Sequence, residues 1–206
     1  MVKEILFATT NQGKVKELKE AFAQAGIEAV IKTNADLNNP PIVNEYGTTF
    51  TENAKLKAHE LAEFSGMITI ADDSGLMVDA LNGAPGVHSA RYAGIAHDDA
   101  HNNAKLLAEL GGVPQEKRTA KFNTTIVASI PGKFDQDLVV SGQCAGQILA
   151  VPRGEDGFGY DPLFYVPEKN KTFAQMSLDE KNSLSHRGRA IEKLLAAWPE
   201  WLAQIN

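Results

Sequence analysis

One stretch constrains this chain more than any other, an apolar run that ends on two adjacent carboxylates. The run Ile68–Ala71 is followed directly by Asp72, Asp73, Ser74 and Gly75. Short apolar runs of this kind are typical of strands buried in a sheet. Two acids at the end of a buried strand cost free energy unless positive charge lies beside them. A hard divalent cation such as magnesium, which prefers carboxylate oxygens, would offset that cost.

The same residues also fit a simpler interpretation. Asp-Asp-Ser-Gly is favourable turn chemistry on any loop, and Leu76–Leu81 then reads as a separate short strand. On this stretch alone, a surface turn and a metal site are equally good interpretations. Other parts of the chain have to decide between them.

Length and composition indicate an ordinary globular protein. The chain has 206 residues, of which 43% are hydrophobic and 22% charged, and we expect a single domain over residues 1–206. Its one cysteine, Cys144, cannot form a disulfide within the chain, which fits a reducing compartment. No apolar run approaches the ~20 residues that span a bilayer. Met1–Ile5 leads straight into a strand without a signal-peptide apolar region, so we expect a cytoplasmic protein with no membrane partner.

The net charge restricts the possible partners. At −6, the chain lacks the overall basic character that a non-specific grip on nucleic acid requires, so we expect no nucleic-acid partner. A small anionic ligand is still possible, but it would need a local cluster of Lys and Arg or a metal ion.

The N-terminal residues have the layout of an anion-binding unit. Glu4–Thr10 reads as a strand, Asn11–Gly13 as a tight turn, and a helix is expected from Lys14 to about Ala25. A strand followed by a polar turn and a helix aims helix N–H groups at an anion. The stretch is not a P-loop, since it has only the Gly-Lys core of that motif. An ordinary connecting turn is the favoured interpretation when these residues are taken alone.

The remaining patterns predict a mixed sheet with helices. Capping boxes at Thr49-x-x-Glu52 and Ser177-x-x-Glu180 predict two helix starts. Arg118–Ile130 alternates with period two, and a second strand over about Leu138–Ala150 returns as a hairpin. Since the earlier elements alternate strand and helix, the fold class is α/β with a sheet that is not wholly parallel.

The stretch His97-Asp98-Asp99-Ala100-His101 has two interpretations. Two histidines four residues apart on a helix can share a metal ion. An Asp at a helix start also caps the helix and suits its dipole. We favour capping by the acids, because the zincin pattern requires Glu directly after the first His and Asp98 stands there.

Two further stretches carry candidate ligand-binding residues. Gly154–Val166 combines glycines with aromatic residues that could lie against a flat ligand, or could simply form a turn with buried rings. Near the C-terminus, Lys181, His186, Arg187 and Arg189 form the strongest short basic cluster. It could be a solvated helix start, but positive charge at a helix N-terminus opposes the dipole. Basic residues at a position that is unfavourable for the helix, with no evident structural benefit, indicate a functional role.

Five short motifs follow one another along the chain: Thr9–Lys14, Ala71–Leu76, Gly83–Gly86, Phe158–Pro162 and Ser185–Gly188. Together they resemble the inosine triphosphate pyrophosphatase family, whose members hydrolyse non-standard purine nucleoside triphosphates. Each motif alone is modest, but five in register over nearly the whole chain make a specific match. One departure is Thr10, which stands where many relatives carry Gly or Asn.

The resemblance implies a fold and an activity. The implied fold is a long mixed β-sheet flanked by helices, with two lobes and a central cleft. The implied protein is a homodimer that uses Mg²⁺ and cleaves between the α and β phosphates to give a monophosphate and pyrophosphate. ITP, dITP and XTP would be its substrates, and their removal would prevent incorporation into DNA and RNA.

The resemblance also assigns roles to matching positions. Asp73 would bind the metal and accept a proton from the attacking water, and Glu45 would be the other metal ligand. The implied substrate-binding residues are Thr9, Thr10, Asn11, Gln12, Gly13, Lys14, Ser74, Phe158, Gly159, Tyr160, Asp161, Lys181, His186 and Arg187. Within this set, donors from Lys181, His186 and Arg187 could select a 6-oxo purine over adenine.

Other functions remain open at this point. A pyrophosphatase of the related Maf-like group would act on modified pyrimidine nucleotides instead. A nucleotide sensor would bind ITP with Mg²⁺ but release no pyrophosphate. A nucleic-acid-binding module fits least well, because of the net charge.

Overall fold

The structure is a computed structural model that describes residues 3–204. Its strands are β1 (Lys3–Phe7), β2 (Ala29–Thr33), β3 (Ile68–Val78), β4 (Thr119–Ser129), β5 (Leu138–Ile148), β6 (Phe164–Val166) and β7 (Lys171–Thr172). The α-helices of this range are α1 (Gln12–Gln24), α2 (Phe50–Ser65), α3 (Asp99–Glu109), α4 (Leu178–Leu184) and α5 (His186–Gln204), and short 3₁₀ segments connect several of the elements.

The strands form one mixed sheet, as the sequence predicts. Their order is β2-β1-β3-β4-β5-β6-β7. β1 pairs in parallel with β2 and with β3, whereas β6 pairs antiparallel with β5 and with β7. The α/β fold class is therefore confirmed.

The described chain divides into two compact units. Unit 1 comprises residues 1–73, 124–142 and 188–206, and unit 2 comprises residues 74–123 and 143–187. The boundary falls inside β3, between Asp73 and Ser74. The predicted motif Ala71–Leu76 therefore contributes residues to both units. Each unit has its own apolar core, and the two are described separately below.

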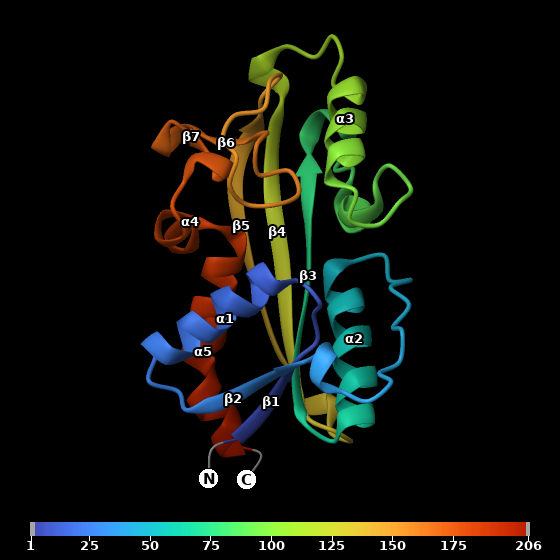
Figure 1. The fold of residues 1–206 in the computed structure, drawn as a ribbon, viewed down its shortest axis with the longest axis vertical. Helices are drawn as coiled ribbons and strands as arrows, with labels where there is room; N and C mark the ends of the chain where they lie inside the picture. Colours follow the sequence, from blue (N-terminus) through green and yellow to red (C-terminus); the bar gives the residue numbers. More distant parts are fainter. Residues whose placement is uncertain (1–2, 205–206) are drawn as a thin grey trace. The chain divides into compact units, whose positions relative to one another are not determined.

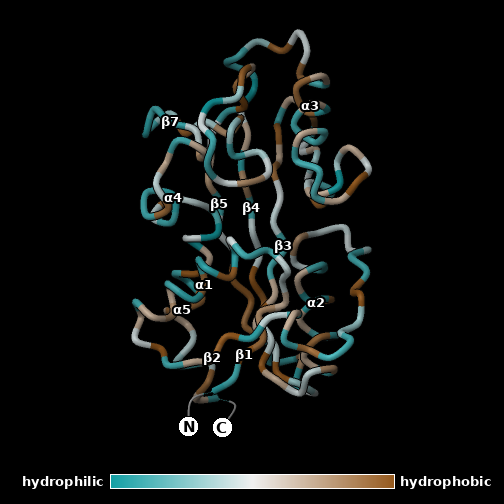
Figure 2. Tube along the Cα trace, in the orientation of Figure 1, coloured by the Kyte–Doolittle hydropathy of each residue, from teal (hydrophilic) through white to brown (hydrophobic). Residues whose placement is uncertain are grey.

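In unit 1, helices cover both faces of the sheet (Figure 1). One face packs Ile5, Phe7 and Ile70 against α1 and α5, and the other packs Leu6, Ala8 and Ala71 against α2. In Figure 2 the hydrophobic colour gathers on the strands of this unit, and the tube of α2 carries both hydrophilic and hydrophobic segments. Because side chains alternate along a strand, neighbouring residues of β1 and β3 face different helices.

Unit 2 has an apolar core rich in aromatic rings. The rings of Phe122 and Phe164 lie 4.7 Å apart between centroids, and those of Phe164 and Phe173 lie 4.8 Å apart. Leu106 and Leu110 of α3 are buried in the same core. This core supports the loop and the helices that carry the predicted base-binding residues.

The structure corrects two predicted boundaries, those of β3 and α1. β3 does not end before the carboxylates but continues through Asp72 and Asp73 to Val78, so the turn interpretation of this stretch is wrong. α1 begins at Gln12, which places Gln12 and Gly13 in its first turn. α5 begins at His186 and continues past Pro199 to Gln204.

The continuation of α5 has a visible cause. Proline removes one helical hydrogen bond and disfavours a helix interior. Beyond Pro199, however, Trp201 is buried, its ring lies 5.1 Å from that of Trp198, and its Nε1 donates to the carbonyl of Gln136 at 2.6 Å. Burial of the two indole rings offsets the lost bond.

The helix starts predicted from capping residues agree with the structure. Thr49 with Glu52 and Ser177 with Glu180 each form a complete capping box. Asp98 caps α3, since its carboxylate accepts the N–H of His101 at 3.1 Å. Among residues 3–204, no helix combines the length and the apolar character that a membrane crossing would need.

Candidate active site

The turn between β1 and α1 is held by its own side chains. The Asn11 side chain accepts the N–H of Lys14 at 3.1 Å, and the Asn11 N–H donates to the Thr9 hydroxyl at 3.2 Å. Thr10, Gln12 and Gly13 are exposed. The first turn of a helix presents N–H groups without intrahelical acceptors, and its dipole favours an anion.

Asp72 lies on the face of β3 that packs against α1. It shares this face with Ile70, two residues earlier, and its side chain is 1% exposed. Both of its carboxylate oxygens accept from Lys14 Nζ, at 3.0 and 2.8 Å. The parallel pairing of β1 with β3 explains this contact, because the carboxyl end of β1 runs beside Ile70 and delivers α1 there.

Asp73 lies on the opposite face and contacts α2. Its Oδ2 accepts from Asn53 Nδ2 at 3.1 Å, and its Oδ1 lies 3.9 Å from Lys57 Nζ. The same Lys57 ammonium is 3.3 Å from Oε1 of Glu45. One lysine therefore stands within ion-pair distance of two carboxylates. We call Lys14, Glu45, Asn53, Lys57, Asp72 and Asp73 the acid–lysine cluster.

Burial dominates the ionisation of Asp73. It raises the pKa of this carboxyl from 3.8 to about 6, and the nearby carboxylates of Glu45 and Asp72 add to that effect. Lys57 and the hydrogen bond from Asn53 oppose it. A carboxyl with a pKa near 6 is mostly ionised at neutral pH, and its negative charge is incompletely compensated.

The donor set of the acid–lysine cluster fits a magnesium ion. Glu45 and Asp73 supply only carboxylate oxygens, and the position of Lys57 marks a place where positive charge is favourable. Within residues 3–204, no group of three or more His, Cys, Asp or Glu side chains is arranged to hold a metal. A site with two carboxylates suits Mg²⁺, which usually takes its other ligands from water and substrate phosphates.

Unit 2 contains the other predicted residues. Lys181, His186 and Arg187 are buried, at 6%, 5% and 3% exposed, so the interpretation of a solvated helix start is wrong for these three. Arg189 is exposed. The His186 ring stacks on Phe122 at 4.7 Å between centroids. Burial of three basic side chains is costly and needs a reason.

The loop before β6 lies against Lys181 and Arg187. Lys181 Nζ is 4.8 Å from the centre of the Phe158 ring, and Arg187 Cζ is 5.7 Å from it. The Asp161 carboxylate accepts from Lys181 Nζ at 2.6 Å and from the Phe158 N–H at 2.9 Å. Burial raises the pKa of Asp161, and the Lys181 ammonium opposes that rise. We call Phe158, Asp161, Phe173, Lys181, His186 and Arg187 the aromatic–basic cluster.

The predicted residues thus fall into two groups. In unit 1, Lys14 contacts Asp72 on one face of β3, and Glu45 and Asp73 share Lys57 on the other face. The structure brings Phe158, Asp161, Lys181 and Arg187 together in unit 2. Ser74, half-buried on β3, belongs to unit 2 and follows Asp73 directly.

Sequence reasoning missed two residues of the acid–lysine cluster. Asn53 and Lys57 lie one turn apart on α2, on the face that also carries Ala54, Ala58 and Leu61. Lys57 has a side chain only 15% exposed. The helical pattern of α2 places position 57 on its inward face, where an apolar residue is expected. A lysine there was the signal that could have identified Lys57.

Comparison with known proteins identifies relatives of the whole chain. A model of the Ham1 family matches residues 5–197. A dITP/XTP pyrophosphatase of Lactobacillus acidophilus is 68% identical over 199 residues, which cover 97% of this chain and 98% of the relative. A dITP/XTP pyrophosphatase of Geobacillus kaustophilus is 52% identical, over 97% of this chain and 96% of the relative.

Solved structures agree with these relatives. The Ham1 protein of Staphylococcus aureus is 42% identical, has a TM-score of 0.85, and is matched over 96% of this chain and 99% of that one. A Ham1 protein from Coxiella burnetii is 39% identical, has a TM-score of 0.88, and is matched over 97% of this chain and 100% of that one. The similarity therefore extends over both units.

Proposed function

Because the chain belongs to the Ham1 family, we propose that it is a nucleoside triphosphate pyrophosphatase for non-standard purine nucleotides. Its substrates would be dITP, XTP and ITP, and its products the monophosphate and pyrophosphate. Relatives that carry the name dITP/XTP pyrophosphatase include one that is 68% identical to this chain. Removal of such nucleotides would keep them out of DNA and RNA.

One observation of the site carries the proposal. Glu45 and Asp73 converge on the same cation, Lys57, in the unit where Asp72 holds Lys14 beside the β1–α1 turn. This arrangement offers carboxylates for a metal ion, and an ammonium and helix N–H groups for phosphates. Phosphoryl transfer needs mainly such positioning and charge neutralisation, so no covalent nucleophile is required.

Magnesium is part of the proposal as a cofactor. Glu45 and Asp73 would hold it. When bound, it would neutralise charge on the triphosphate oxygens and complete its coordination with them and with water. The donor set supports this choice, because hard oxygen ligands suit Mg²⁺.

Asp73 and Lys14 would act directly in the reaction. The oxygen of the attacking water would form a bond to the α-phosphorus. The bond from this phosphorus to the α–β bridging oxygen would break, and that oxygen would leave with pyrophosphate and take the electron pair. Asp73 would also accept the proton of the water. Its pKa of about 6 is that of the metal-free carboxyl, and a bound Mg²⁺ would lower it. Lys14 would bind phosphate oxygens, with Thr9–Gly13 supplying further donors.

The aromatic–basic cluster would recognise the base. Phe158 provides a flat apolar surface, and Lys181, His186 and Arg187 provide donors for a 6-oxo group. Adenine carries a 6-amino group at that position, which would present hydrogens to these donors. Gly159, Tyr160 and Ser74 would complete the contacts to base and sugar.

Two parts of the proposal concern the assembly and the cell. We keep the homodimer as a prediction that analytical ultracentrifugation at micromolar concentration tests directly. A cytoplasmic location also remains a prediction.

The test is pyrophosphate release across a nucleotide panel. The purified full chain is given dITP, XTP, ITP, dGTP, dATP and dUTP, each with MgCl₂ or with EDTA. We expect fast release of pyrophosphate from dITP, XTP and ITP, slow release from dGTP and dATP, and none in EDTA.

Other outcomes would contradict the proposal in different ways. Preference for dUTP would place the activity with the pyrimidine-specific group. Tight binding of ITP without pyrophosphate would indicate a sensor, and release of orthophosphate would indicate a different bond cleaved. Undiminished release in EDTA would remove the metal from the mechanism.

A further inference from the structure

The loop that carries Phe158 is held from outside by one helix. The Gly159 N–H donates to Oδ2 of Asp99 at 2.7 Å, and the Gly159 carbonyl accepts from Nδ2 of Asn103 at 2.9 Å. Both helical residues belong to α3, and all three lie in unit 2. A single loop residue is therefore gripped at both of its backbone polar groups.

The spacing of the two side chains explains why they can share one partner. Asp99 and Asn103 are four residues apart, so they lie one above the other on the same face of α3. Asp99 also stands in the first turn, where an acid suits the helix dipole. The dipole explains an acid at this position, but it does not explain a bond to a residue 60 positions away.

The chemistry of each bond is directional. A backbone N–H can only donate, so position 99 must supply an acceptor. A backbone carbonyl can only accept, so the amide of Asn103 must turn its nitrogen towards Gly159. The other atom of that amide, Oδ1, is buried without a hydrogen-bond partner. Turning the amide over would set this oxygen against the Gly159 carbonyl, so the bond to Gly159 fixes the orientation of the amide.

The two hydrogen bonds to Gly159 restrict the position of the neighbouring Phe158 ring. Gly157 and Gly159 both have positive φ angles, of 84° and 63°, and they flank Phe158. Left-handed glycines leave a loop with many accessible conformations unless other contacts select one. Here Asp161 holds the Phe158 N–H, and α3 holds the next residue. These bonds keep the Phe158 ring against Lys181 and Arg187.

We propose that Asp99 and Asn103 are positioning residues for purine recognition, which fix the Phe158 ring by holding Gly159 from α3. The inference rests on the proposed function, because it takes the aromatic–basic cluster as the base pocket. In this role both residues act through Gly159 and not by contact with the nucleotide. Their loss should weaken base selection and leave the handling of the triphosphate intact.

Two isosteric substitutions test the direction of the bonds. Asp99→Asn keeps an acceptor oxygen for the Gly159 N–H, so it should stay within about twofold of the wild-type KM for dITP. Asn103→Asp removes the donor and sets a carboxylate against the Gly159 carbonyl. It should raise KM about tenfold and reduce the kcat/KM preference for dITP over dATP about fivefold, with kcat changed little. Asp99→Ala should resemble Asn103→Asp.

One control variant and three further measurements separate positioning from damage to the fold. Asp179→Asn removes a charge from an exposed residue of α4 and should match the wild type. Inhibition by inorganic tripolyphosphate, which has phosphates but no base, should be the same in all variants. Amide hydrogen exchange at Gly159 should accelerate in Asp99→Ala, and thermal unfolding should stay within a few degrees of the wild type.

The result that overturns the inference is equally specific. Equal effects of Asp99→Asn and Asn103→Asp on the KM for dITP would contradict the proposal. An unchanged kcat/KM preference for dITP over dATP in Asp99→Ala and Asn103→Asp would also contradict it. A parallel loss of tripolyphosphate inhibition would also end it, because that loss indicates a general defect. If the wild-type chain itself releases no pyrophosphate from dITP, the proposed function fails instead.

Discussion

The acid–lysine cluster and the aromatic–basic cluster have opposite charge balances. The first sets three carboxylates, those of Glu45, Asp72 and Asp73, against two lysines. The second sets three buried basic side chains against the carboxylate of Asp161. The first suits a metal with phosphates, and the second suits a planar base rich in acceptor oxygens.

The two clusters are also built differently. Asp72 and Asp73 lie on a regular strand and are fixed by helices on its two faces. Phe158 lies on a loop between two left-handed glycines. Every nucleoside triphosphate carries the same phosphates, but only some carry a 6-oxo purine. Changes in the first cluster should therefore affect all substrates, and changes in the second should affect discrimination.

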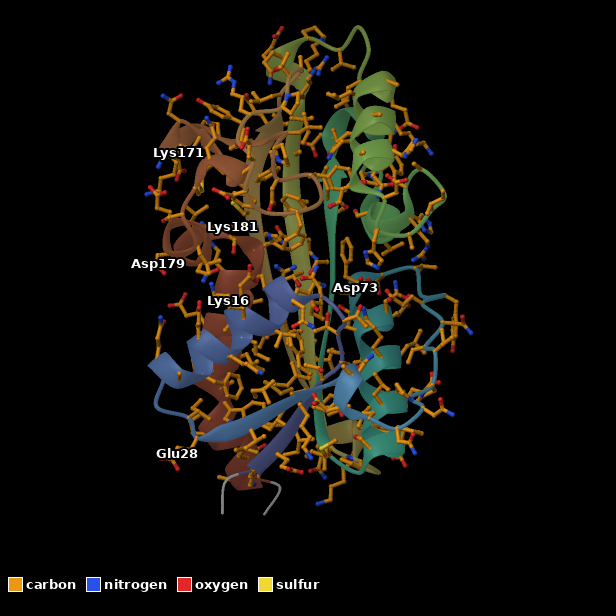
Figure 3. All side chains as sticks on the ribbon, in the orientation of Figure 1. Lys16, Glu28, Asp73, Lys171, Asp179 and Lys181 are labelled. Carbon is orange, nitrogen blue, oxygen red and sulfur yellow. The ribbon has the colours of Figure 1, made fainter. Side chains whose placement is uncertain are left out.

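The largest expected effect is the loss of turnover in Asp73→Asn. The amide can neither accept the proton of water nor provide a second anionic ligand, so kcat should fall about 10²- to 10⁴-fold for every nucleotide. Pyrophosphate release measures it. Figure 3 labels Asp73 among the packed side chains and Asp179 at the edge of the view. Asp179→Asn should behave as wild type, and near-normal kcat in Asp73→Asn would refute its role.

The next effect should come from Lys14→Ala. Without the ammonium, phosphate oxygens lose one charged donor, and kcat/KM should fall about 10²-fold for dITP and dATP alike. The matched control is Lys16→Ala, which removes a lysine that is 64% exposed on the same helix. A selective loss for one base would contradict the division between the clusters.

Much of the acid–lysine cluster could be read from the sequence. The buried strand pattern gave the position of the acids, and the resemblance gave Lys14, Glu45 and Asp73 their roles. The strand's end was misjudged, because Asp-Asp-Ser-Gly is also turn chemistry. In the folded chain each acid is buried with a partner from a different helix, so the strand can continue. The period of two already separates Asp72 from Asp73 onto opposite faces.

The contacts of the aromatic–basic cluster depend on long-range packing. The burial of Lys181 and Arg187 is set by the loop and the rings around them, and no local pattern states it. The bonds from Asp99 and Asn103 to Gly159 join residues 60 and 56 positions apart. Helical periodicity places Asp99 and Asn103 on one face, but it does not name the segment they bind.

Arg187→Ala should produce a smaller and more selective change. The variant loses a donor for the 6-oxo group, so the kcat/KM ratio of ITP to ATP should fall about tenfold, equivalent to about 1.4 kcal/mol. Hydrolysis of both nucleotides measures this ratio. The control Arg189→Ala removes an exposed arginine two residues along α5. An unchanged ratio in Arg187→Ala would count against the base pocket.

The last prediction concerns stability and pH in the metal-free protein and does not involve turnover. The pKa of Asp73 is raised from 3.8 to about 6 in the folded chain, so the unfolded chain loses this proton first as pH rises. The ionised carboxylate therefore costs stability, by about 3 kcal/mol at most, in full above pH ~6 and not at all below pH ~4.

Asp73→Asn removes this penalty and should be more stable than the wild type at pH 8 in EDTA. The gain should shrink as pH falls through 6 and vanish near 4, as measured by urea unfolding. Magnesium should stabilise the wild type and not the variant, because only the wild type keeps both carboxylates. Glu28→Gln, at an exposed residue, should show neither trend. An equal gain at all pH values would mean that the buried charge of Asp73 is not the source of the stability penalty.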